Sequence, residues 1–277
     1  TLIVHWEDIH GRALPAADQP VEQLLTRLDS MRPADVADVI HDLSPKRRME
    51  VARGLDDEQL ADVLEELPED DRVEIVQKLE AERAADVLEE MDPDDAADLI
   101  SELPPEQAAD LLQRMEPEDA EDIRRLLTYD ELSAGGMMTT EPIVLPPDAT
   151  VADALAQIRN PDLSPALASQ VYVTRSPMET PTGRYLGTCH FQQLLREPPA
   201  TLVSALVDTN MMPVGPDAPL HVITRYFAAY NLVALPVVDE NNHLLGAVTV
   251  DDVIDHMLPD DWRDEDDDVL GGAANGD

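Results

Sequence analysis

The chain has 277 residues, and its 59 Asp and Glu against 19 Lys and Arg give a formal net charge of −40. This charge excludes a general nucleic-acid binder, because phosphate backbones are bound through Lys and Arg, and it disfavours anionic membrane surfaces. Hydrophobic residues make up 43% and aromatic residues only 3%, so the chain can fold around a core of aliphatic side chains and Met. The length predicts two domains.

Cysteine content and hydropathy predict a cytoplasmic protein. The single cysteine, Cys189, excludes an internal disulfide framework and a cysteine-based zinc site, and a reducing compartment is the simplest interpretation. The longest run without a charged residue, Tyr226–Val238, has 13 residues, whereas a membrane-spanning helix needs about 20. No signal peptide is present. The chain starts at Thr1 rather than Met, so we expect residues 1–20 to be the end of a truncated upstream domain.

Residues 21–128 form an acidic internal repeat. Large apolar anchors recur at every twelfth position, at Met31, Leu43, Leu55, Leu67, Leu79, Met91, Leu103, Met115 and Leu127. Apolar residues also precede most anchors by four and six positions, which fits a short amphipathic helix. Ser44 and Asp92 stand before prolines that follow an anchor, as an N-cap stands before the first turn of a helix. Because helices this short are marginal alone, the sequence predicts a right-handed superhelix of stacked helices with the anchors in its core.

Residues 129–140 are expected to be a linker, since they contain paired glycines, and strand-like and helix-like segments follow. The first unit, 141–197, contains strands at 143–145, 170–174 and 185–189 and helices at 150–158 and 190–195. The second unit, 198–258, contains strands at 211–214, 234–238 and 244–248 and helices at 220–230 and 250–257. Two β-α-β-β-α units in tandem predict a second domain that mixes helices and sheets. Residues 259–277 are expected to be an acidic disordered tail.

Three features together resemble the cytosolic part of MgtE magnesium transporters. They are the acidic helical array with its twelve-residue repeat, the linker sequence Ser133–Pro142, and the segment Leu235–Asp255, which alone is typical of a CBS (cystathionine-β-synthase) domain. The resemblance covers residues 21–258 and implies a superhelical N domain at 21–128, then CBS1 at 141–197 and CBS2 at 198–258. The opening residues 1–10 resemble the exit strand of a PRC-barrel domain, which precedes this array in actinobacterial relatives.

The resemblance implies a regulatory role in magnesium transport and ion homeostasis. Family members are homodimers whose acidic N-domain and CBS faces come together around Mg²⁺ and release when it falls. The sequence lacks the transmembrane part of the family. Two interpretations remain open: a truncated transporter, or a relative without a pore. The ending Gly271–Asp277 favours the second. A membrane magnesium transporter or another protein is the expected regulated partner.

Carboxylates at helical spacing are the candidate metal ligands. Mg²⁺ prefers carboxylate and water oxygens, with Ca²⁺ and Mn²⁺ as alternatives, and acids three or four residues apart share one helix face. Matched to the family's motifs, the predicted ligands are Asp62, Asp94, Asp98, Asp252 and Asp255. One family carboxylate is Asn231 in this chain. The competing interpretation is a solvated acidic face, which a chain with 59 acids produces by chance.

Adenine-nucleotide binding is a further expectation from the CBS resemblance. CBS pairs hold the ribose of ATP or AMP with a three-residue pattern. It consists of a Gly, a Ser or Thr three positions later, and an Asp three positions after that. Gly246, Thr249 and Asp252 match this pattern, whereas the first unit has Gly187, His190 and Gln193. In MgtE relatives the ATP-linked aspartate belongs to the first unit, so Gln193 argues against ATP.

Catalysis is not expected. The seven histidines are scattered, no H-E-x-x-H or G-x-S-x-G pattern occurs, and Cys189 lies in an apolar strand. We therefore interpret the chain as a non-enzymatic Mg²⁺-sensing module that switches between open and compact states. The alternatives are an acidic scaffold for a basic protein partner and an adenine-nucleotide sensor.

Overall fold

The computed structural model describes residues 20–161 and 163–258. The described residues up to Ala120 form one compact unit, and Glu121–Leu258 form a second. The predictions for residues 1–19 and for the tail at 259–277 lie outside the described residues. In the described part of the chain, no helix is both long and apolar enough to cross a membrane.

The first unit consists of short helices, and a new helix begins at every twelfth position, as the repeat predicts. They are α2 (Val21–Leu28), α3 (Pro33–His41), α4 (Pro45–Ala52), α5 (Asp57–Glu66), α6 (Glu69–Lys78), α7 (Ala81–Glu89), α8 (Pro93–Glu102), α9 (Pro105–Arg114) and α10 (Pro117–Leu126), the last of which runs into the second unit. Ser44 and Asp92 occupy N-cap positions with proline at the first helical residue, as predicted.

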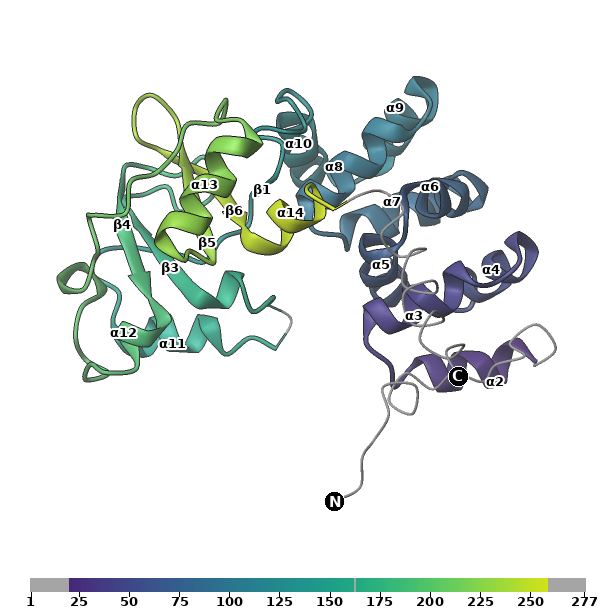
Figure 1. The fold of residues 1–277 in the computed structure, drawn as a ribbon, viewed down its shortest axis with the longest axis horizontal. Coiled ribbons are helices and arrows are strands. Elements are labelled where there is room, and N and C mark those ends of the chain that lie inside the picture. The colour runs from purple at the N-terminus through teal and green to yellow at the C-terminus, as the bar shows by residue number, and fades with distance from the viewer. Residues whose placement is uncertain (1–19, 162, 259–277) are drawn as a thin grey trace, which may run out of the picture. The chain divides into compact units, whose positions relative to one another are not determined.

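The helices pack in two rows, because each one contacts the helix two units along the chain. One row is α3, α5, α7 and α9, and the other is α2, α4, α6 and α8; Figure 1 shows the stack. Polar contacts join neighbours in a row: the guanidinium of Arg83 on α7 lies 2.9 Å from the Asp57 carboxylate on α5 and donates to the Leu55 carbonyl oxygen at 2.6 Å. The structural period of the array is therefore two sequence units.

The core of this unit contains most of the anchors and also the apolar residues that precede them. The fully buried side chains include Ile40, Leu64, Ile75, Leu88 and Leu99, which precede their anchors by three or four residues. The anchors themselves close the turns between helices. Most are buried, but Leu127 is 38% exposed. The prediction that the anchors form the core was thus correct for most of them and wrong for Leu127.

A buried ionic network joins the early helices. Arg48 on α4 and Asp71 on α6 are 7% and 9% exposed and form an ion pair. The Arg48 guanidinium also donates to the carbonyl oxygen of His41 at 2.9 Å and to the Glu74 carboxylate at 3.3 Å. The second oxygen of Asp71 lies 2.7 Å from Nδ1 of His41. Because a buried charge is costly unless it is paired, each partner depends on the other.

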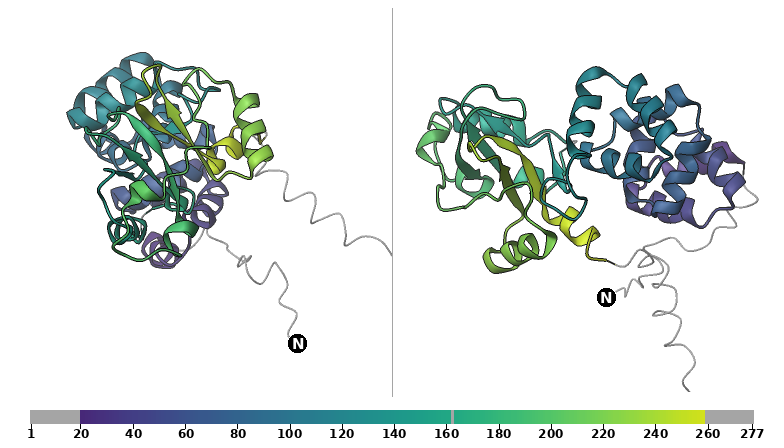
Figure 2. Two further views of the ribbon diagram at one scale, coloured as in Figure 1. Left: turned by 90° about the vertical axis from the view of Figure 1, so that its left-hand side faces the viewer. Right: turned by 90° about the horizontal axis from the view of Figure 1, so that it is seen from above.

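The second unit contains two three-stranded sheets with flanking helices. The elements are β1 (Met138–Thr139), β2 (Val144–Leu145), α11 (Val151–Ile158), η2 (Leu167–Ser169), β3 (Gln170–Thr174), β4 (Tyr185–His190), α12 (Phe191–Leu194), η3 (Val203–Ala205), α13 (Leu220–Tyr230), β5 (Ala234–Val238), β6 (Leu244–Thr249) and α14 (Val250–Asp255). The sheet orders are β2-β3-β4 and β1-β6-β5. Figure 2 shows the sheets and their helices from two further sides.

Most predicted elements of this unit occur where expected, with one exception. The strand expected at 211–214 is reduced to a single parallel bridge between Val214 and Val237. Pro213 explains part of this difference, because proline has no backbone N–H to donate to a sheet. Thr150 caps α11 through a capping box with Asp153, which agrees with its predicted N-cap role.

Two short segments of the second unit each pair with a strand that is distant in the sequence, and we call them crossing segments. Thr139, in the expected linker, pairs with Ala247 of β6, and Asp208 pairs in the equivalent way with Thr188 of β4. A glycine stands next to each crossing. A Cβ atom at Gly246 would overlap the carbonyl oxygen of Thr139, and one at Gly187 would overlap the segment that carries Asp208. The glycines therefore allow a close backbone approach, which fixes the position of Asp208.

Candidate functional site

The predicted metal ligands of the first unit lie on α5 and α8. Asp62 is exposed on α5. Asp94 is buried in the first turn of α8, at 7% exposure, and Asp98 lies one turn later and is half-buried. Asp94 and Asp98 thus have the helical spacing that the sequence indicates. Whether these residues bind a metal stays a prediction.

A second group of acids, which the sequence did not single out, lies between the same two helices. Glu65 near the end of α5, Asp92 at the N-cap of α8 and Asp95 in its first turn each offer one oxygen, and these oxygens lie within 4.8 Å of one another. Glu65 Oε1 also accepts a hydrogen bond of 2.7 Å from the backbone N–H of Asp92. Three convergent carboxylates form a donor set of the kind that Mg²⁺ and Ca²⁺ prefer.

The electrostatics of this group disfavour three negative charges. Burial of Glu65 is the largest cause that raises its pKa to about 8, and the charges of Asp92, Asp62 and Glu66 raise it further, against the opposing N–H of Asp92. At neutral pH the Glu65 carboxyl therefore holds a proton unless a cation takes its place. The positive charge of a divalent cation beside these oxygens would favour loss of that proton.

Glu89 repeats the position of Glu65 two units later. Its Oε1 accepts a hydrogen bond from the backbone N–H of Glu116, and burial, together with the charges of Asp119, Asp86 and Glu116, raises its pKa. In the described part of the chain, three acids with metal-compatible spacing converge at Glu65. Glu65 and Asp92 are 27 residues apart in the sequence. The sequence alone does not predict that they meet, because this depends on how the two rows of helices stack.

The predicted ligands of the second unit lie on α14. The Asp252 carboxylate accepts hydrogen bonds from the backbone N–H of Thr249 at 3.1 Å and from its hydroxyl at 2.6 Å. These contacts form a capping box at the start of α14. Asp255 ends the helix and is exposed. Asp252 therefore has a structural role that is independent of any ligand.

The predicted nucleotide residues have structural roles too. Gly246 lets β1 approach β6, and Thr249 is buried and caps α14. The Gly-x-x-Thr-x-x-Asp pattern is thus explained locally by sheet packing and helix capping. A role of these residues in nucleotide binding stays a prediction.

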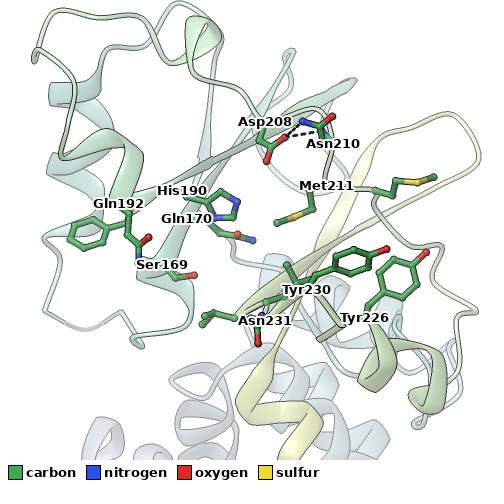
Figure 3. A pocket seen from close by; sticks show the side chains of 14 residues that line it. Ser169, Gln170, His190, Gln192, Asp208, Asn210, Met211, Tyr226, Tyr230 and Asn231 are labelled. Atoms are coloured by element: carbon green, nitrogen blue, oxygen red, sulfur yellow. Dashed lines mark hydrogen bonds between the residues drawn. The ribbon is translucent and has the colours of Figure 1, made fainter. Parts of the chain in front are cut away.

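A cavity of about 620 Å³ lies in the second unit, between the end of β4, the segment that contains Asp208 and the end of α13. Figure 3 shows its walls: His190 is the last residue of β4, Asp208 and Asn210 come from the crossing segment, and Tyr226 and Tyr230 come from α13. The lining includes His190 of the altered first-unit pattern, and Gly246, Thr249 and Asp252 do not belong to it. Its volume is within the range of small-molecule pockets.

Four uncharged amides are among the polar residues that line the cavity. Asn231 ends α13 in the left-handed conformation, with φ of 50°, which Asn tolerates better than most residues. This residue lines the cavity together with Gln170 and Gln192. These amides are uncharged, and they can both donate and accept hydrogen bonds.

Comparisons with known proteins match three segments of the chain to two domain families. The model of the MgtE intracellular N domain matches residues 31–132, and the CBS domain model matches twice, at residues 134–198 and 203–259. The magnesium transporter MgtE of Thermus thermophilus is 32% identical over 133 residues, which are 48% of this chain and 28% of that protein. MgtE of Bacillus subtilis is 29% identical over 154 residues, which are 56% and 32%. The match spans less than a third of either transporter.

Two solved structures resemble the chain over most of its length. The soluble part of a magnesium transporter is 26% identical with a TM-score of 0.77, and the match covers 86% of this chain and 91% of that one. The cytosolic domain of the Mg²⁺ channel MgtE in complex with ATP is 28% identical with a TM-score of 0.77, and the match covers 87% and 96%. The chain therefore contains an MgtE intracellular N domain followed by two CBS domains, and it is a homologue of the MgtE magnesium transporters.

Proposed function

We propose that the chain is a non-enzymatic Mg²⁺-sensing regulatory module of magnesium transport. The grouping of Glu65, Asp92 and Asp95 carries the proposal, because it concentrates carboxylate oxygens that repel one another, and burial together with the neighbouring acids raises the pKa of Glu65. A divalent cation relieves that repulsion more directly than the few Lys and Arg of a chain with net charge −40 can. The homology to MgtE proteins supports Mg²⁺ as the cation.

In the proposed mechanism, Mg²⁺ shifts a population from an open to a compact state. A ligand shifts such an equilibrium only if it binds one state more tightly. We propose that Asp62, Asp94 and Asp98 of the first unit and Asp252 and Asp255 of the second supply this difference, because carboxylates that share Mg²⁺ in the compact state are separated in the open one. When Mg²⁺ falls, mutual repulsion returns the module to the open state.

We also propose that the module acts as a homodimer through its CBS domains. Ile254 on α14 is 48% exposed and Met257, just after it, is 57% exposed, and apolar side chains in such positions favour a covered face. Sedimentation of the wild type and of an Ile254→Glu, Met257→Glu variant tests this. A monomeric wild type contradicts the proposal.

Small-angle scattering during a Mg²⁺ titration tests the sensor, with NaCl at equal ionic strength as the control. We expect Mg²⁺ alone to reduce the radius of gyration. Asp98→Asn with Asp255→Asn should weaken the response, whereas Asp86→Asn, an exposed acid on α7, should not. If NaCl produces the same compaction, the charges are merely screened, and an acidic scaffold for a basic partner becomes the better explanation.

An adenine nucleotide bound in the second unit is a second candidate function. It is supported by the cavity at His190 and by the similarity to a cytosolic domain that was solved with ATP. Equilibrium dialysis with ATP and AMP measures it directly. Absence of binding at millimolar ligand contradicts it without affecting the Mg²⁺ proposal.

A further inference from the structure

The segment that follows α10 is exposed at first and then buried. Residues 133–140 of the expected linker are all buried within the second unit. The N–H of Ala134 donates to the carbonyl oxygen of Ala218 at 2.8 Å, and Thr139 pairs with β6. Residues 127–132, just before them, are largely exposed. Because domains usually move about exposed connections with few contacts, the natural joint after α10 is 127–132.

The connection between β3 and β4, residues 175–184, is a closed loop that is anchored on β6. The N–H of Gly183 donates to the carbonyl oxygen of Pro177 at 2.8 Å and closes the loop. Thr182 is buried, and its N–H donates to the carbonyl oxygen of Leu244 in β6 at 2.9 Å. The Thr182 hydroxyl oxygen accepts a hydrogen bond from the N–H of Leu244 at 3.2 Å. The loop therefore offers a fixed surface to its neighbours.

Thr180 of this loop binds both sides of the joint. The guanidinium of Arg125, near the end of α10, donates to the Thr180 carbonyl oxygen at 3.2 Å and to its hydroxyl oxygen at 3.3 Å. The same hydroxyl donates to the carbonyl oxygen of Thr140 at 2.7 Å. The Asp122 carboxylate, one turn earlier on α10, lies 2.9 Å from Nη2 of Arg125 and orients it. Arg125 precedes 127–132 and Thr140 follows it, so these hydrogen bonds close a ring around the joint.

We propose that residues 175–184 are a strap that locks the joint at 127–132 and keeps the end of α10 in the second unit. While the strap is closed, the two compact units divide within α10, after Ala120, and not at the joint. When the contacts of Thr180 break, α10 can turn about 127–132. The strap therefore limits the movement that this joint allows. This inference goes beyond Mg²⁺ sensing, because the lock consists only of protein hydrogen bonds.

Amide hydrogen exchange of the full chain in EDTA, followed by mass spectrometry, tests the strap. The N–H groups of residues 127–129 donate to carbonyl oxygens of α10, so their exchange reports local opening at the joint. We expect Arg125→Met and Thr180→Val each to accelerate this exchange at least tenfold. Met keeps the aliphatic stem of Arg, and Val keeps the shape of Thr without its hydroxyl. The double variant should add little to either single variant, because both break the same ring.

Two control variants separate the strap from a general effect on the fold. Arg196→Met and Thr209→Val change exposed residues of the same unit and should leave the exchange at 127–129 unchanged. Unchanged exchange in both Arg125→Met and Thr180→Val overturns the proposal. Equal acceleration at 127–129 and in β3 also overturns it, because the whole unit would then have lost stability. The measurement needs no Mg²⁺, so a failure of Mg²⁺ sensing leaves its result intact.

Discussion

Replacing Glu65 by Gln should make the chain more stable at high pH relative to the wild type. The substitution removes the ionisable carboxyl but keeps an oxygen that can accept the hydrogen bond from the N–H of Asp92. Burial and the neighbouring acids raise the pKa of Glu65 from 4.5 to about 8. Between pH 4.5 and about pH 8, the folded chain therefore keeps the Glu65 proton that the unfolded chain has lost. The free energy of unfolding of the wild type thus falls as pH rises through this range.

The size of the effect follows from the width of that window. One bound proton changes the free energy of unfolding by about 1.4 kcal/mol per pH unit. Between pH 5 and pH 7 the wild type should thus lose about 3 kcal/mol that Glu65→Gln does not lose. The loss should continue up to the folded-state pKa of about 8 and then stop, because both states are ionised above it.

Urea unfolding at half-unit steps from pH 5 to pH 9, in EDTA, measures this difference. Glu58→Gln is the matched control, since Glu58 lies exposed on the same helix. We expect its stability to follow that of the wild type at every pH. A difference between wild type and Glu65→Gln that does not change with pH would show that the folded state does not hold the additional proton, and the electrostatic basis of the site would then be wrong.

Three further outcomes follow from the packing. Arg48→Met should lower the free energy of unfolding by about 3–5 kcal/mol, because it leaves the buried Asp71 without its cation, and the double variant with Asp71→Leu should recover most of this loss in urea unfolding. Gly246→Ala should lower the thermal midpoint, because its methyl group would overlap the Thr139 carbonyl oxygen; an unchanged midpoint contradicts that contact. Cys189 is buried and its pKa is raised to about 11 by burial, so a thiol reagent should label it slowly until urea is added.

The repeat could be predicted from the sequence because its signals are local. Apolar spacing and proline positions fixed where each helix begins, and the strands at 170–174 and 234–238 agree with the structure in both bounds. The metal-compatible grouping could not be found in this way, since Glu65 and Asp92 meet only after helices of the two rows pack. The charge pattern alone offers many equivalent pairs of acids.

The cavity could not be predicted for a similar reason. Its walls combine the end of β4, a crossing segment and the end of α13, which lie far apart in the sequence, from Ser169 to Val233. The sequence pattern drew attention to Gly246, Thr249 and Asp252, whose conformations are explained by strand packing and capping. His190, which departs from the expected pattern, lines the cavity instead.

The two-row stacking also sets how such an array can change length. Each helix contacts the helix two units away, and Glu65 and Glu89, which occupy the same position two units apart, bind the backbone N–H groups of Asp92 and Glu116 in the same manner. Loss or gain of a single repeat unit would move every later helix into the opposite row and separate these partners. Insertions and deletions that conserve the packing must therefore come in pairs of helices, so that the structural unit of this array is the helix pair and not the single repeat.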